Sequence, residues 1–123
     1  MGELGYPSSA DELRPRLSRL LNDEASFVYV AATDDSVIGF ATGYVIPLIH
    51  RDAPIGRLTA MAVSAGARGS GAGRALVDSV TAEAKARGCH RLEVTSGAHR
   101  TDAHGFYERL GFEDRPRRFV KPL

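Results

Sequence analysis

The spacing of apolar residues near the start of the chain predicts a helix. Leucines recur at intervals of three and four residues over Ala10–Leu21, which places them on one helix face. Ser9 and Glu12 stand at the spacing of a capping box. Pro15 lies inside the same stretch, and a proline beyond the first turn removes a backbone hydrogen bond. A helix that begins only near Arg14 is therefore the alternative.

Three stretches rich in β-branched and aromatic residues predict successive strands. Ser26–Ala32 and Val37–Ile49 flank the turn signal Asp34-Asp35 and are expected to form a hairpin. Ile55–Val63 is apolar towards its end, as in a buried central strand. Two glycines in the second strand indicate bends or a bulge, and three aromatic residues of the hairpin are expected in the core. These residues are Gly39, Gly43, Tyr29, Phe40 and Tyr44.

The second half of the chain predicts a crossover. A glycine-rich stretch leads into a helix that ends at Arg87, before Gly88. A short strand follows over Arg91–Thr95, then a helix over Asp102–Leu110 with apolar residues on one face. Arg117–Lys121 is expected to form a last edge strand. This order predicts an α/β fold with a mixed sheet.

Composition limits the class of protein more than it changes the fold. The chain has 123 residues, 43% of them hydrophobic, and a net charge of +1. This length predicts one domain over residues 1–123, and the near-zero charge argues against a general nucleic-acid binder. Cys89 is the single cysteine, and the sequence shows neither an apolar run of membrane-spanning length nor a signal peptide. A cytoplasmic protein without membrane contact is expected.

The stretch Val63–Arg74 is the strongest chemical signal. A strand, a glycine-rich turn and a helix succeed one another, an order that directs backbone N–H groups and the positive end of a helix dipole at one point. Glycines also let the backbone approach a bulky anion closely. The lysine of a nucleotide P-loop is missing, and the glycines alternate rather than follow the dinucleotide fingerprint. Arg-x-x-Gly-x-Gly fits, read as Arg68-Gly69-Ser70-Gly71-Ala72-Gly73.

With this loop, the sequence resembles the GNAT-type N-acetyltransferase superfamily, whose acetyl-CoA pyrophosphate loop has that form. Downstream, Ala103–Phe112 is similar to the family's tyrosine-bearing helix and its Leu-Gly-Phe turn. The resemblance covers nearly the whole chain. It implies a mixed, mostly antiparallel central sheet flanked by helices, with the family's first strand missing because only Met1–Leu4 precede the segment that matches. Either the start of the chain is truncated, or another chain covers the edge that the missing strand leaves open, which raises the expectation of a homodimer.

The resemblance also implies roles for individual residues. Backbone groups of Met61 and Val63 would pair with the pantetheine arm as an added strand, and the loop would hold the pyrophosphate. Tyr107 would protonate the departing thiolate, although it also fits a core aromatic residue on the apolar helix face. The residues to which the resemblance assigns contact with acetyl-CoA are Met61, Ala62, Val63, Arg68, Gly69, Ser70, Gly71, Ala72, Gly73, Arg74 and Arg100.

Two positions depart from the family pattern. Thr59 stands where many members carry a glutamate that draws a proton from the amine, and a threonine cannot act as that base. Arg100 replaces an asparagine that contacts the cofactor. The general base is therefore unassigned. Candidates by proximity in sequence are Glu93, His99, Asp102 and His104, and loss of the proton to solvent is a further option.

The remaining motifs are weaker. The histidines His50, His90, His99 and His104 lack the spacing of a zinc site, so no metal is expected. Cys89 fits a small buried group better than a nucleophile. An arginine run near the C-terminus fits a solvated edge better than a site for the ribose phosphate of the cofactor or for an acidic substrate. That run consists of Arg115, Arg117 and Arg118.

The sequence therefore predicts an N-acetyltransferase that moves an acetyl group from acetyl-CoA to a primary amine in a ternary complex. The amine belongs to a small molecule or a peptide, and the long strand Val37–Ile49 is an alternative lining for its pocket rather than a part of the core alone. The alternative, supported by Thr59, is a catalytically weak acyl-CoA-binding or regulatory domain. A binder of nucleotide phosphates is a third reading.

Overall fold

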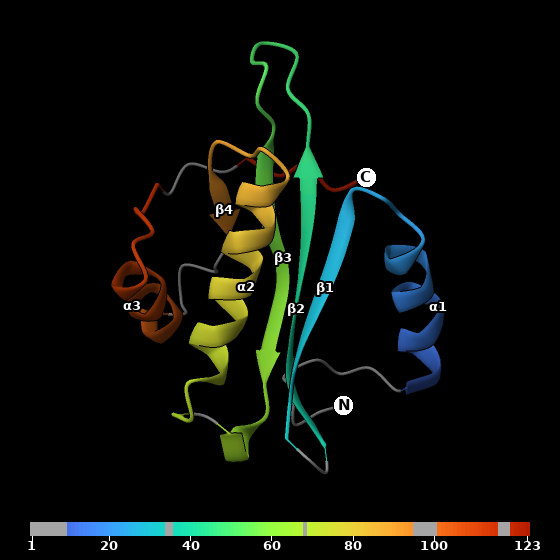
Figure 1. The fold of residues 1–123 in the computed structure, drawn as a ribbon, viewed down its shortest axis with the longest axis vertical. Coiled ribbons are helices and arrows are strands. Elements are labelled where there is room, and N and C mark those ends of the chain that lie inside the picture. The colour runs from blue at the N-terminus through green and yellow to red at the C-terminus, as the bar shows by residue number, and fades with distance from the viewer. Residues whose placement is uncertain (1–9, 34–35, 68, 95–100, 116–118) are drawn as a thin grey trace.

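Four strands form the sheet of this protein. The computed structural model describes residues 10–33, 36–67, 69–94, 101–115 and 119–123. Within it, β1 (Ser26–Ala32), β2 (Val37–Ile46) and β3 (Ile55–Val63) are antiparallel neighbours. β4 (Leu92–Val94) pairs with β3 in parallel, giving the order β1-β2-β3-β4 (Figure 1). The predicted mixed α/β sheet is confirmed.

The helices flank this sheet. α1 (Ala10–Leu21) lies beside β1, and α2 (Ala72–Ala86) lies across one face (Figure 1). A short 3-10 helix, η2 (Ala65–Ala67), joins β3 to the loop before α2. α3 (Thr101–Arg109) lies on the β4 side of α2. α2 therefore serves as the crossover that parallel pairing of β3 with β4 requires. None of the helices in the described ranges is long and apolar enough to cross a membrane.

The predicted helix over Ala10–Leu21 is confirmed, whereas the bounds of two predicted strands were wrong. α1 begins at Ala10 and continues through Pro15, so the alternative start near Arg14 is excluded. β2 ends at Ile46 rather than Ile49 because Pro47 follows, and a proline cannot donate to the ladder. The expected edge strand fails at its described end, since Phe119–Lys121 are not in a strand. Asp34-Asp35 lies outside the described residues.

The core lies between α2 and the sheet. Leu76, Val77 and Val80 of α2 pack against three sheet residues, Phe27, Ala41 and Leu58. Val80 is fully buried, and burial of each such side chain contributes roughly 1.5–3 kcal/mol. Ala84 extends the buried stripe by one further turn. This spacing is the helical periodicity that the sequence predicted.

Strand alternation divides the sheet into two faces. Ala41 and Leu58 face α2, so residues one position away face the opposite side, here called the back face. Thr42 and Tyr44 of β2 belong to it. The prediction of a core position was wrong for Tyr44, which is 36% exposed on the back face. Tyr29 and Phe40 are half-buried.

A register shift beside Gly43 confirms the predicted bulge, and packing also requires a glycine there. A Cβ atom at this position would overlap the Phe27 ring. Gly43→Ala is therefore expected to destabilise the fold by about 1–3 kcal/mol, the usual cost of overpacking. Urea unfolding measures this cost.

A matched glycine in α3 gives the control. Gly105→Ala places its Cβ only against the flexible Arg109 guanidinium, at 3.3 Å from Nη1. Alanine has the higher helix propensity, so this variant should gain up to about 1 kcal/mol. Equal effects of the two substitutions would contradict the packing argument.

A polar clamp connects β1 to the end of α2. The Tyr29 hydroxyl donates to Glu83 Oε1, and Arg87 Nε donates to Glu83 Oε2 at 2.8 Å. Arg87 also donates from Nη1 to the Glu24 carbonyl at 2.6 Å and lies over the Phe27 ring, 5.1 Å from its centroid. The hydrogen bond from Arg87, followed by that from Tyr29, lowers the pKa of Glu83.

This clamp predicts acid sensitivity. Because the pKa of Glu83 is lower in the folded state, its contribution is complete above the ordinary value of 4.5 and is lost as the pH falls through the folded pKa. We expect the free energy of unfolding to fall more steeply below pH 4.5 in the native protein than in Glu83→Gln. Urea titrations over this pH range measure both slopes. Glu113→Gln, at an exposed pair with Arg115, should retain the native slope; a similar flattening there would contradict the assignment to Glu83.

Candidate active site

The glycine loop before α2 has the backbone shape of an anion cradle. Gly69 and Gly71 have φ angles of +84° and +90°, which favour glycine strongly. A Cβ atom at either position would meet nothing within 4 Å, so the space above the loop is open. Gly73 differs, because its Cβ would lie 3.3 Å from Phe106 Cζ. Gly73 therefore allows α2 and α3 to pack closely at this end.

The first turn of α2 presents unsatisfied donors. Gly71 precedes the helix and gives it no side-chain cap. The Ser70 hydroxyl accepts a long hydrogen bond from the Ala72 N–H, at 3.4 Å. Among the described residues, the N–H groups of Gly73 and Arg74 have no hydrogen-bond acceptor. These donors and the helix dipole favour a bound anion.

Arg74 adds a cation at the rim of this loop. Its side chain is 73% exposed, and its Nε lies 3.9 Å from Asp78 Oδ2. So exposed and long an ion pair is weak, which leaves the guanidinium able to turn towards a phosphate. Arg68, the other predicted cation, lies outside the described residues.

β3 is paired along its whole length on one side only. β2 pairs with it from Ile55 to Val63, whereas the described part of β4 pairs only with Gly56–Leu58. Between Thr59 and Val63, the other edge has no strand partner among the described residues. Alternate backbone N–H and C=O groups point to such an edge and can accept an extended ligand as an added strand. The open edge contains the predicted residues Met61, Ala62 and Val63.

Thr59 marks the point where this edge begins. Thr42 is opposite Ala60 and Gly43 is opposite Leu58, so Thr59 is the extra residue of a bulge. Its hydroxyl lies 2.7 Å from the Thr42 hydroxyl and donates to the Thr42 carbonyl at 3.1 Å. The Thr59 side chain is thus a member of a neutral hydrogen-bonded pair on the back face. Gly43 indicated a bulge from the sequence, but the partner Thr42 and the extra residue Thr59 were not found, since both follow from cross-strand register.

Tyr107 belongs to the aromatic packing at the far side of α2. Its ring makes edge contacts with Phe106 at 5.3 Å and Phe112 at 5.5 Å between centroids. It is half-buried and packs against the core cluster that includes Leu76. The core interpretation of the ring is therefore supported, and the hydroxyl's role in catalysis stays a prediction.

Glu93 is held by two arginines. Arg57 Nη2 lies 2.7 Å from Oε1, and Arg91 Nη2 lies 2.8 Å from Oε2. The hydrogen bond from Arg57 is the main cause of a lowered Glu93 pKa, and the charge of Arg91 adds to it. A carboxylate with a lowered pKa is a weak proton acceptor, so the structure does not favour Glu93 as general base. Sequence analysis did not select Arg57 and Arg91 as site residues. Their alternation with apolar residues along each strand is the one sequence signal that could have identified them.

Several other candidates are not placed. Arg100 and His99 lie outside the described residues, as do the side chains of Asp102 and His104. Cys89 is half-buried, and burial raises the pKa of its thiol, which fits a packing role. Among the described residues, no three His, Cys, Asp or Glu side chains gather as metal ligands.

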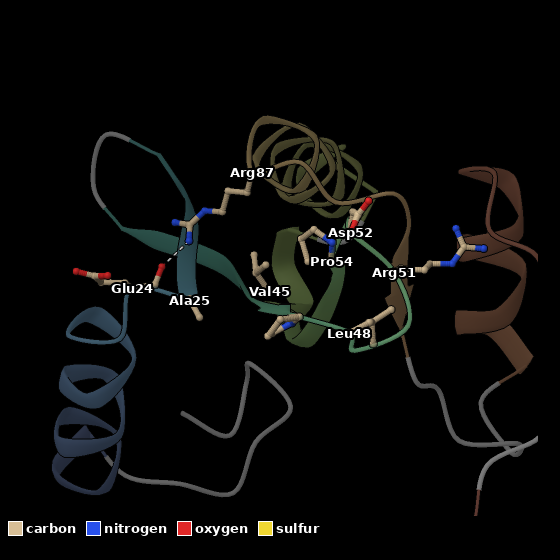
Figure 2. Close-up of a pocket in the computed structure, with 9 residues that line it drawn as sticks. Glu24, Ala25, Val45, Leu48, Arg51, Asp52, Pro54 and Arg87 are labelled. Carbon is tan, nitrogen blue, oxygen red and sulfur yellow. Dashed lines mark hydrogen bonds between the residues drawn. The ribbon is translucent and has the colours of Figure 1, made fainter.

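A hollow of about 420 Å³ lies at the other end of α2 (Figure 2). Arg87, Glu24 and Asp52 are among its lining residues. The 15-residue helix α2 spans about 22 Å at 1.5 Å per residue, and it separates this hollow from the glycine loop. The hollow is therefore remote from the glycine loop.

Comparisons with known proteins agree with this arrangement. The sequence model of the Acetyltransferase (GNAT) family matches residues 3–112. A comparison with curated proteins gave no significant match. Among solved structures, a transcriptional regulator from Bacillus halodurans C-125 is 26% identical with a TM-score of 0.82, over 95% of this chain and 77% of that one.

Two further structures have the same fold. A GNAT family acetyltransferase from Staphylococcus aureus is 22% identical, with a TM-score of 0.82 over 99% of this chain and 83% of that one. An aminoglycoside N-acetyltransferase in complex with CoA is 20% identical, with a TM-score of 0.84 over 98% of this chain and 81% of that one. The family match covers most of the sequence and agrees with the four-stranded mixed sheet. The chain belongs to the GNAT acetyltransferase family.

Proposed function

We propose that the protein transfers an acetyl group from acetyl-CoA to a primary amine, with both substrates bound together. The observation that carries this proposal is the open edge of β3, which lies next to the uncapped start of α2. An extended amide chain fits the edge, and a pyrophosphate fits the N–H groups of the loop. The open edge of β3 and the glycine loop follow one another along the chain. The pantetheine arm and the pyrophosphate follow one another in the same way along a CoA molecule.

The chain's own residues would bind and orient the reactants. Acetyl-CoA supplies an acetyl group activated as a thioester. The amine nitrogen forms a bond to the carbonyl carbon, the carbon–sulfur bond breaks, the nitrogen loses a proton and the sulfur gains one. A backbone N–H at the open edge would stabilise the negative charge that develops on the carbonyl oxygen, and the Tyr107 hydroxyl would protonate the sulfur. Solvent would take the proton of the amine, because the structure favours no described residue as the base.

A thiol-release assay across a panel of amines tests this function. Acetyl-CoA binding is measured in parallel by calorimetry. Binding together with amine-dependent thiol release is the expected result. Tight binding without turnover on any amine would favour the acyl-CoA-binding alternative instead. Thermal stabilisation by ATP or NAD but not by CoA would contradict both.

We also propose that the protein forms a homodimer. β1 is an edge strand, and on its outer side no strand pairs with it among the described residues. Val30 of β1 and Leu17 and Leu21 of α1 expose apolar side chains near this edge. Pairing with a second copy would cover these groups. The cytoplasmic location stays a prediction.

A further inference from the structure

A row of functional side chains crosses the back face beside the open edge of β3. Tyr44 of β2 is opposite Arg57 of β3, and Arg57 is opposite Glu93 of β4. All three face away from α2, because their neighbours Leu58 and Leu92 pack on the α2 side. Arg57 and Glu93 stand one residue before the described β3–β4 pairing ends. The row therefore borders the place where the acetyl group would lie.

The opposite side of the sheet is closed. α2 covers it, and Phe106 and Tyr107 of α3, with Leu110 directly after that helix, pack against the same core. With a CoA molecule along the β3 edge, the plane of the sheet is occupied as well. Within the described part of the chain, the back face is then the side from which an acceptor amine can reach the acetyl group. The first charged groups it meets belong to the row.

Positive charges outnumber negative charges around this row. Arg57, Glu93 and Arg91 form a cluster with two guanidinium groups and one carboxylate, a formal net charge of +1. The Arg57 and Arg91 side chains are 43% and 47% exposed, so both are accessible to a ligand. Each guanidinium has five N–H donors and gives Glu93 only a part of them. Arg57 Nε is buried and has no acceptor among the described residues.

The surroundings of β4 add to this positive field. His90 lies near Arg51, Arg91 and His50, and its pKa is lowered by desolvation and by the charges of the two arginines. A polycationic acceptor would be repelled here, whereas an anionic group would be attracted. Guanidinium groups bind carboxylates and phosphates through paired hydrogen bonds.

We propose, on the basis of the function proposed above, that the acceptor is an amine that also carries an anionic oxygen group, and that Arg57 and Arg91 bind this group. One structural neighbour is named as an aminoglycoside N-acetyltransferase, and aminoglycosides are polycations rather than anionic amines. A carboxylate and a phosphate share the required chemistry. The experiment distinguishes them.

The test compares matched acceptors in the thiol-release assay. L-Phenylalanine is paired with L-phenylalaninamide, glucosamine 6-phosphate with glucosamine, and kanamycin represents the polycations. At least one anionic member should have a kcat/KM about tenfold or more above that of its neutral partner, as expected for a charge-assisted hydrogen bond. The pair that shows this preference identifies the anion as carboxylate or phosphate.

Variants then assign the preference to the cluster. Arg57→Gln and Arg91→Gln should each reduce the ratio of anionic to neutral kcat/KM, mainly through KM for the anionic member. Arg57→Lys should retain more of the ratio than Arg57→Gln. Arg115→Gln removes an exposed cation outside the cluster and should leave the ratio at its native value. If the cluster serves only to join β4 to β3, Arg57→Gln would change stability and leave the ratio of anionic to neutral kcat/KM unchanged. That result would overturn the proposal.

Failure of this proposal is distinguishable from failure of the proposed function. Acetylation of kanamycin or of the neutral members in preference to the anionic ones overturns the acceptor class, while acetyl transfer itself stands. If no amine is acetylated, both proposals fail together. Acetyl-CoA binding measured on the same preparations shows whether the cradle is intact in each variant.

Discussion

Gly71→Val is expected to weaken CoA binding by about 100-fold or more. Gly71 has a φ of +90°, a conformation that a β-branched residue essentially does not adopt. The loop must therefore change its backbone path, and the N–H groups of Gly73 and Arg74 no longer point to one place. Loss of two hydrogen bonds to a charged phosphate, each worth roughly 1.5–3 kcal/mol, corresponds to this factor. Isothermal titration calorimetry with CoA gives the dissociation constant directly.

Gly66→Ala is the matched control in the same loop region. Gly66 has no positive φ, and a Cβ there would meet nothing within 4 Å. This variant should bind CoA as the native protein does. Gly71→Val is expected to fold, because the large core side chains of α2 begin at Leu76, and circular dichroism and the thermal midpoint measure this. Native affinity in folded Gly71→Val would contradict the cradle.

Tyr107→Phe should lower kcat by about 100-fold, the low end of general acid catalysis, while CoA affinity stays close to native. Phenylalanine preserves the edge contacts with Phe106 and Phe112, so the packing of α3 is retained. Only the hydroxyl is lost. Steady-state thiol release gives kcat, and calorimetry gives the affinity.

Phe112→Leu provides the contrast to this substitution. It disturbs the same aromatic cluster without removing a hydroxyl, so it should lower stability and change kcat much less. An unchanged kcat in Tyr107→Phe would leave Tyr107 with a packing role alone. The full loss of kcat is seen only where protonation of the CoA thiolate limits the rate. Several acceptors that differ in their rate of thiol release should therefore be compared.

Much of the fold could be predicted because local signals agreed with it. The bounds of β3 were predicted residue for residue, since an apolar run stands between a proline and the glycine loop. The α2 stripe was predicted from its periodicity. β2 was predicted too long because apolar residues continue past Pro47, and the proline outweighs them.

The parts that failed depend on register between distant strands. Tyr44 is apolar enough for a core, but its position relative to Gly43 directs it to the back face. The Thr59 bulge needs two strands to exist at all. The pair of Arg57 and Glu93 joins residues 36 positions apart, and parallel pairing through α2 brings them together. Gly43 indicated a bend or bulge in its strand, but no local pattern specifies which residues pair across the strands.

The short contact between β3 and β4 has a consequence for how the protein opens. β1, β2 and β3 form a meander of local hairpins, whereas β4, as far as the structure describes it, pairs with β3 along three residues after a long crossover. Contacts between residues far apart in the sequence are slow to form. A region held by few contacts exchanges its amide hydrogens through low-energy openings. The amides of β4 should therefore exchange faster than those of β2 in the free protein. A ligand strand on β3 would bridge the two parts and protect them as one cooperative unit.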